Sequence, residues 1–284
     1  MKSGICTLCG MQTDQLSQDH IQPQCAFNEK HRRYIRMENV QTTKFRQNQI
    51  LQRPKLRNIY DEIQPDRPIS GGIYRYTQCT FCNGYLGEFY DARFGRWCHM
   101  AVSSMKAGQI LIAKREYIQK CQFPLSILKR IVAMFFSING DEFAKSNPEL
   151  SAFVRNSNST KLPKNFRFFA AYNMNDIVSH IPTQSRLNIK TSYCCTLSQI
   201  AHPPFVYVMT LDSESPDTRL TEISNFAGYA YEDQADLDVA LRVVSTNNCF
   251  AGDFRSGGKV IEDDIAVLVS DVKPSYFRII DVVL

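Results

Sequence analysis

The spacing of apolar side chains predicts one strong helix in the middle of the chain. Five of them recur at helical intervals: Leu125, Leu128, Ile131, Val132 and Phe135. Pro124 stands at a favourable helix start, and Asn139-Gly140 is a typical helix end. We therefore expect a helix over residues 124–139 whose apolar stripe faces a core. A helical turn near 147–150 and a polar loop over 156–165 are expected to follow it.

The C-terminal part of the chain is rich in residues that favour strands. Strands are expected over residues 166–172, 205–211, 241–245, 265–270 and 277–284. Turn sequences such as His202-Pro203-Pro204 separate them. His180 and His202 each lie close to a proline, so we expect both in loops.

The N-terminal third predicts two short strands and a helix. Residues 16–22 form the first expected strand, and residues 73–77 alternate after Gly71-Gly72 and form the second. Asn83 is expected to open the helix. The whole chain is therefore predicted to be α+β. A small unit over residues 1–100, with an insertion over 24–70, precedes a larger α+β domain over 101–284 of unknown role.

The composition is typical of a soluble globular protein. The 284 residues are 44% hydrophobic and 21% charged, with a mean hydropathy of −0.28. The longest purely apolar run, residues 131–136, is too short to span a bilayer. No apolar signal segment precedes the first cysteine. We therefore expect a cytoplasmic protein without membrane contact.

Four of the ten cysteines form two Cys-x-x-Cys pairs, Cys6/Cys9 and Cys79/Cys82. In a reducing compartment such pairs favour zinc over disulfides. Four thiolates fill a tetrahedral zinc site without leaving an open position, so this zinc would be structural. It would join two segments that are far apart in the sequence. A plain zinc ribbon that binds nucleic acid or protein is the simpler alternative.

The positive charge is concentrated in the first half of the chain. Residues 1–120 carry 18 Lys+Arg against 10 Asp+Glu, whereas the remainder is mildly acidic. Residues 30–57 hold nine cations against one acid: Lys30, Arg32, Arg33, Arg36, Lys44, Arg46, Arg53, Lys55 and Arg57. Such a run suits contact with a nucleic-acid backbone, with a solvated loop as the alternative. Arg93 and Arg96, after the second cysteine pair, could also grip a phosphate.

An acid, an imidazole and a carboxamide accompany the cysteine pairs. Asp19-His20 lies between the pairs, and Asn83 follows the second pair directly. Histidine can deprotonate a water near neutral pH, and Mg²⁺ prefers oxygen ligands such as Asp19 and Asn83. Adjacent strand residues point to opposite faces, so Asp19 and His20 share a site only if the backbone bends there or if the metal and water lie beyond the end of the strand. Glu88 and Asp91 on the expected helix could also face a metal, although a solvated helix face is the simpler prediction.

These motifs resemble the zinc-containing branch of the HNH, or ββα-metal, endonucleases. The resemblance rests on Cys-x-x-Cys, Asp19-His20-Ile21-x-Pro23 and Cys-x-x-Cys-Asn83, and covers about a third of the chain. It implies an N-terminal zinc-stapled ββα-metal unit with His20 as general base and Asp19 and Asn83 as ligands of Mg²⁺ or a similar cation. The family's middle asparagine could be Asn39, Asn48 or Asn58.

The leading hypothesis is therefore a metal-dependent HNH endonuclease that hydrolyses nucleic acid, with DNA as the expected substrate. The resemblance suggests a bacterial defence or mobile-element context. The C-terminal domain would then serve substrate choice, regulation, oligomerisation or a partner protein. The main alternative is a non-catalytic zinc-ribbon protein that binds nucleic acid and keeps the HNH fold. A third alternative is a partner-recognition protein that uses the cysteine knuckle as a scaffold.

Overall fold

A three-stranded antiparallel sheet joins segments that lie far apart in the sequence. In the computed structural model, which describes residues 2–28, 32–36, 68–69, 72–106, 116–173, 177–188, 193–216, 219–244 and 280–283, its order is β1-β2-β5. The strands are β1 (Lys2–Ile5), β2 (Gln12–His20) and β5 (Tyr74–Cys79). The two strands expected at 16–22 and 73–77 are thus the paired strands β2 and β5, with slightly different bounds.

A long helical segment follows β5 directly. It consists of α2 (Thr80–Leu86), a π-helical turn η3 (Gly87–Asp91) and α3 (Ala92–Lys106). The helix begins at Thr80 rather than at the expected Asn83. Cys79 is its N-cap, because the Cys79 Sγ accepts a hydrogen bond from the Cys82 N–H at 3.4 Å. The boundary expected at residue 100 falls within α3.

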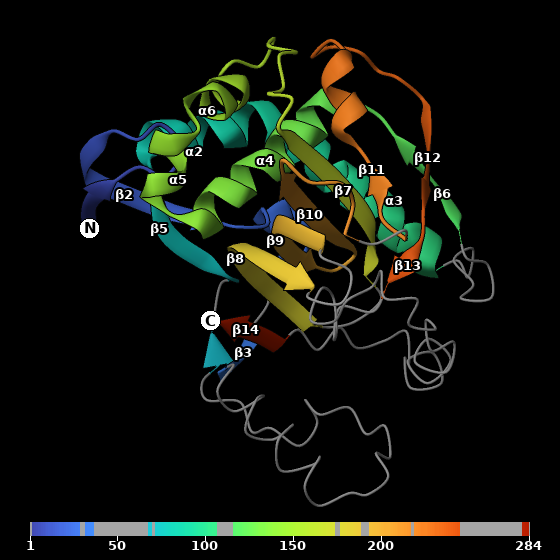
Figure 1. Cartoon of the computed structure of the whole chain (residues 1–284), viewed down its shortest axis with the longest axis horizontal. Helices are drawn as coiled ribbons and strands as arrows, with labels where there is room; N and C mark the ends of the chain where they lie inside the picture. Colours follow the sequence, from blue (N-terminus) through green and yellow to red (C-terminus); the bar gives the residue numbers. More distant parts are fainter. Residues whose placement is uncertain are drawn as a thin grey trace, which may run out of the picture.

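The second half of the chain contributes most of a nine-stranded sheet that curves into a half-barrel (Figure 1). Its order is β11 (Thr221–Glu222), β7 (Phe166–Asn173), β10 (Phe205–Leu211), β9 (Tyr193–His202), β8 (Ile177–Asn188), β14 (Ile280–Val283), β3 (Arg32–Arg36) and β4 (Pro68–Ile69). The ninth strand, β13 (Val243–Val244), pairs with β7. A separate ribbon pairs β6 (Tyr117–Cys121) with β12 (Leu237–Leu241). Short 3-10 turns, η1 (Gln24–Ala26) and η4 (Ser224–Gly228), complete the fold.

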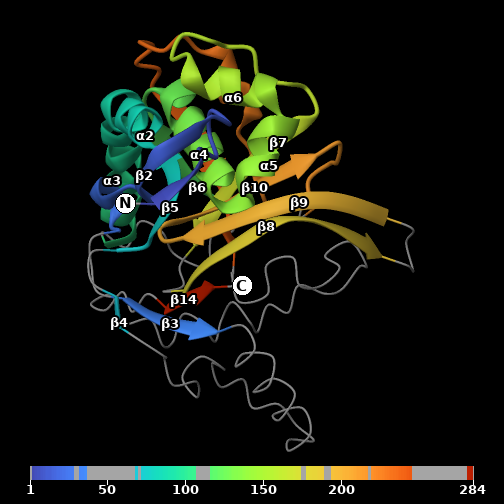
Figure 2. The same cartoon turned by 90° about the vertical axis from the view of Figure 1, so that its left-hand side faces the viewer.

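Three helices lie on one side of the curved sheet (Figure 2). They are α4 (Pro124–Asn139), α5 (Asp141–Ser146) and α6 (Pro148–Arg155). The expected bounds of α4 are confirmed, and its predicted apolar stripe is fully buried. The helix is buried on every side, however, and this includes the charged side chains of Lys129 and Arg130. Among the described residues, no helix has the length and apolar character needed to cross a bilayer.

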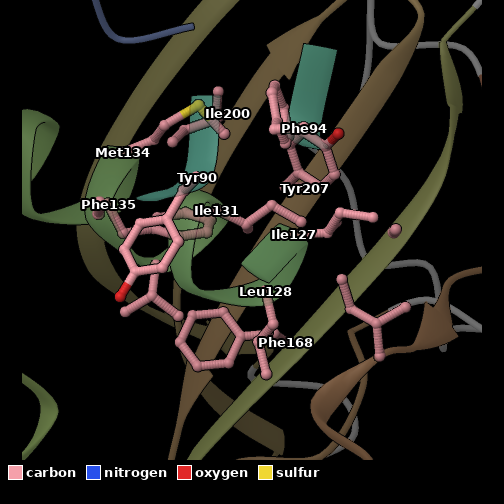
Figure 3. Close-up of a cluster of buried hydrophobic side chains, with 14 of the residues drawn as sticks. Tyr90, Phe94, Ile127, Leu128, Ile131, Met134, Phe135, Phe168, Ile200 and Tyr207 are labelled. Atoms are coloured by element: carbon pink, nitrogen blue, oxygen red, sulfur yellow. The ribbon is translucent and has the colours of Figure 1, made fainter. Parts of the chain in front are cut away.

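One continuous hydrophobic cluster connects the two halves of the chain. Tyr90 and Phe94 pack around α4 together with Phe168 and Tyr207 of the curved sheet (Figure 3). The same cluster includes Cys6 and Cys82, one member of each cysteine pair. The N-terminal sheet therefore shares its core with the α4 helix instead of closing a core of its own.

Several strands differ from the sequence-based expectation. Strands β8 and β9 form an antiparallel pair that the sequence pattern did not indicate. His180 and His202, expected in loops, are buried within these two strands, so that interpretation was wrong. The region expected as a strand over 241–245 is divided between the end of β12 and β13. The strand expected over 265–270 lies outside the described residues.

Candidate functional site

The four paired cysteines meet in one cluster. Their Sγ atoms all lie within 4.8 Å of one another, with Cys6 and Cys82 buried and Cys9 and Cys79 half-buried. A tetrahedral zinc–thiolate centre with bonds of about 2.3 Å places its sulfurs about 3.8 Å apart. A small contraction of the cluster would therefore reach that geometry. The four thiols could hold a metal ion.

The backbone around the cluster forms two tight turns. Gly10 has a φ of +73°, a conformation that suits glycine, and its N–H donates to the Cys6 carbonyl at 2.8 Å. The Thr7 N–H donates to the Thr77 carbonyl at 2.8 Å, which ties the first cysteine turn to strand β5. The Cys79 cap described above closes the second turn. These contacts fix the position of both cysteine pairs, whose four Sγ atoms lie close together.

The Cys6 thiol of the cluster has a lowered pKa. A hydrogen bond with the Cys82 side chain, helped by the backbone near Cys9, Cys79 and Leu8, lowers the pKa of Cys6 to about 4 although burial opposes this. Hydrogen bonds to the charged form favour a thiolate. Because metals bind the thiolate rather than the thiol, this environment suits a metal ligand.

Asp19 does not face the same side of the sheet as His20. Its carboxylate is fully buried, and its Oδ2 accepts hydrogen bonds from Thr77 Oγ1 at 3.0 Å and from the Ser137 hydroxyl of α4. Burial raises the pKa of Asp19, whereas the nearby Arg130 charge and the two hydroxyl donors oppose this rise. The expected convergence of Asp19 with His20 and Asn83 is therefore not observed. The physical reason is the alternation of side chains along β2.

His20 lies on the opposite face, in an open cleft of about 400 Å³. The cleft is lined by Gln18, His20, Cys25, Asn83, Asp91 and Arg130, among others. His20 is half-buried and packs against Tyr74 of the neighbouring strand, with ring centroids 5.7 Å apart. The structure thus brings two of the three expected residues together, His20 and Asn83. The acidic residue that lines the cleft is Asp91 of the η3 turn.

Two hydrogen-bonding arrangements fix the groups that line the cleft. The Asn83 Nδ2 donates to the Gln18 carbonyl at 3.1 Å, which links the start of the helix to the end of β2. The Arg130 Nε donates to Asp91 Oδ1 at 2.6 Å, and its Nη2 donates to the His20 carbonyl at 3.0 Å. Arg130 is only 2% exposed, so this is a buried guanidinium that connects α4 to both cleft segments.

Sequence reasoning did not identify Arg130 as a site residue. It belongs to a helix whose apolar spacing was interpreted as core, and it reaches the cleft only through the packing of distant segments. A signal was nevertheless present, because Lys129 and Arg130 are the only charged residues of a helix that is otherwise mostly apolar. Buried cations of this kind need partners.

The basic residues expected to bind nucleic acid are only partly described. Arg32, Arg33 and Arg36 lie in β3, whose backbone alone is described. Arg93 is held within the protein by Ser126 and the Tyr231 carbonyl and by an ion pair with Glu232 at 3.0 Å. Arg96 is exposed and contacts Gln122. The remaining expected cations lie outside the described residues: Lys30, Lys44, Arg46, Arg53, Lys55 and Arg57. The three asparagines considered for the middle motif, Asn39, Asn48 and Asn58, do so as well.

Comparison with known proteins gives no relative from which a function could be transferred. The chain matches no protein-family model, no curated protein and no solved structure.

Proposed function

We propose that the protein is a metal-dependent endonuclease with an HNH-like N-terminal unit. The observation that supports this is the shared cleft of His20 and Asn83, which lies against helix α2, the helix that begins within the second cysteine pair. Strand β2, strand β5 and helix α2 have the order strand, strand, helix that the motif resemblance implies. The four cysteines would hold zinc, which would fix the relative position of the strand and the helix.

His20 is the group suited to accept a proton from the attacking water. Its position at the end of β2 exposes the imidazole to the cleft, while Arg130 holds the His20 carbonyl and so fixes the backbone below it. Packing against Tyr74 restricts the ring further. Asn83 would orient a divalent cation such as Mg²⁺, which, when bound, would offset the charge that develops on the phosphate.

The test is a cleavage assay on plasmid, linear duplex, single-stranded DNA and RNA with Mg²⁺. We expect His20→Ala to reduce the cleavage rate by about 100-fold or more, the contribution typical of a general base. His99→Ala is the matched control, because this exposed histidine does not line the cleft and touches it only through a contact of its Nε2 with the Cys25 carbonyl at 3.0 Å. Zinc content and thermal unfolding should be equal in all three proteins. Undiminished cleavage by the His20 variant would refute the assignment of the base.

The buried position of Asp19 favours one alternative function. A protein that keeps this fold but holds its motif carboxylate, Asp19, buried away from His20 would bind nucleic acid without cutting it. Such a protein would show binding that weakens steeply with salt, because phosphate contacts release counterions. It would cleave none of the substrates with any divalent ion. The same preparations therefore distinguish the two functions.

A further inference from the structure

The cleft contains an acidic residue that the sequence motif does not assign. We propose that Asp91, together with Asn83, binds the divalent cation of this cleft, in place of Asp19. This inference rests on the proposed nuclease function, and it names a different carboxylate from the one that the motif implies. Three features of the structure carry it: the burial of Asp19, the orientation of Asn83 and the orientation of Asp91.

Asp19 is not accessible to a cation in the cleft. Its side chain has no exposed surface, and one carboxylate oxygen already accepts from Thr77 and Ser137. The strand would have to turn over to bring this carboxylate to the His20 face. Such a change would break both hydroxyl contacts, so the structure opposes it.

The carboxamide of Asn83 is oriented so that its oxygen can act as a ligand. Its Nδ2 donates to the Gln18 carbonyl, and this contact distinguishes the nitrogen from the oxygen of the amide. The Oδ1 atom must then point away from that carbonyl. Asn83 lines the cleft and is half-buried. An amide oxygen held in this way is a ligand type that hard divalent cations accept.

Asp91 is held in a comparable way by Arg130. The guanidinium binds Asp91 Oδ1 at 2.6 Å, and the side chain of Asp91 is 29% exposed, whereas Arg130 is almost completely buried. One carboxylate oxygen therefore faces the protein, which leaves Oδ2 as the candidate ligand atom. Asp91 lies at the end of the π-helical turn η3, two turns beyond Asn83, and both residues line the same cleft. Asp91 and Asn83 together offer one charged and one neutral oxygen.

The charge balance predicts a modest affinity for the cation alone. Arg130 offsets the negative charge of Asp91, so the two side chains together are close to neutral. Mg²⁺ commonly binds through one or two protein oxygens and completes its shell with water and substrate phosphates. Nucleic acid should therefore strengthen cation binding at this site. By linkage, the cation should strengthen nucleic-acid binding by the same factor.

The test is a titration of the zinc-loaded protein with Mn²⁺, followed by the electron paramagnetic resonance signal of the free ion. We expect Asp91→Asn to weaken Mn²⁺ binding by about tenfold or more. Glu88→Gln is the matched control, because Glu88 is an exposed acid of the same helical turn that does not line the cleft. Asp19→Asn should bind Mn²⁺ as the wild type does. Asn83→Asp should bind it more tightly, since it adds a negative charge at the ligand position.

Two outcomes would overturn the inference. One is a loss of Mn²⁺ binding in Asp19→Asn but not in Asp91→Asn. The other is a wild-type protein that does not bind Mn²⁺ at all. Zinc content and thermal unfolding show whether Asp91→Asn folds. If it does not fold, the Asn83→Asp variant provides the test, and an Mn²⁺ affinity equal to that of the wild type would refute the site.

Cleavage measured on the same preparations separates this inference from the proposed function. Mn²⁺ binding through Asp91 without any cleavage would support the site and refute the nuclease. Cleavage that persists in a folded Asp91→Asn variant with unchanged Mn²⁺ affinity would support the nuclease and refute the cation site at Asp91.

Discussion

The buried Arg130 offers a quantitative test of how the cleft is assembled. Its side chain joins three segments, α4, the η3 turn and the end of β2, through Asp91 Oδ1 at 2.6 Å and the His20 carbonyl at 3.0 Å. The perturbation is Arg130→Met, which keeps a long side chain in the core and removes the charge and both donors. Asp91→Asn and the double variant complete a thermodynamic cycle.

The expected effect follows from the contacts of the guanidinium. Loss of two hydrogen bonds that involve a charged donor costs roughly 3–6 kcal/mol in total. Two factors reduce this value. The Arg130 Nη1 is buried and has no hydrogen-bond partner in the described part of the chain, so its removal returns roughly 1–3 kcal/mol. Asp91 is also partly exposed and can rehydrate when its partner is lost. We therefore expect Arg130→Met to lower the free energy of unfolding by about 2–3 kcal/mol.

The assay is urea-induced unfolding of the four proteins, followed by circular dichroism in the presence of zinc. The coupling free energy between positions 91 and 130 should be about 1–3 kcal/mol, as for other contacting charged pairs. The cycle removes the contribution that each substitution makes by itself. A coupling below about 0.5 kcal/mol would show that the ion pair does not hold the cleft together, and it would remove the positional argument for Asp91.

Two further predictions concern other buried groups. The purified protein should release a single zinc ion when its thiols are oxidised. Cys82→Ser should lower both the zinc content and the melting temperature. A zinc content in this variant equal to that of the wild type would refute the cluster as a zinc site. Burial lowers the pKa of Lys129 to about 7, so the folded protein loses this proton at a lower pH than the unfolded chain. The free energy of unfolding should therefore rise between pH 7 and pH 10 relative to Lys129→Met, by at most about 1.4 kcal/mol per pH unit. Parallel pH profiles of the two proteins would contradict this.

The helices and strands that could be predicted from the sequence are those whose spacing of apolar residues matches the way they are buried in the core. Helix α4 has apolar residues at helical spacing between a proline and a glycine, and strand β10 is an almost continuous apolar run, so the bounds of both are confirmed. Strand β8 was missed because residues 177–188 mix polar side chains and a proline. That strand exists because β9 pairs along its length, and such long-range pairing leaves little local signal.

The candidate site was predictable to a similar degree. Cysteine spacing identified all four members of the cluster, because ligand geometry imposes a short and regular interval. The same motif placed His20 beside Asn83. It could not place Asp91 or Arg130, since their positions depend on how α4 packs against the η3 turn. Asp19 shows the limit of motif reasoning: strand alternation argued against a shared site with His20, and the structure follows the alternation.

The buried face of β2 explains why the second half of the chain matters to the cleft. Ser137 of α4 donates to Asp19 and accepts from Gln78 Nε2 at 3.0 Å, so a polar contact joins α4 to both strands that carry the cysteine unit. In α6, the Ser151 hydroxyl donates to the Leu8 carbonyl inside the first cysteine turn at 2.5 Å. These groups are buried, and separating the halves would leave each of them without its partner. The cysteine unit thus depends on α4 and α6 for its packing, and the cleft depends on Arg130 of α4 for its geometry. Substitutions in the second half that shift α4 should therefore alter cation binding in the cleft even though they lie far from His20 in the sequence.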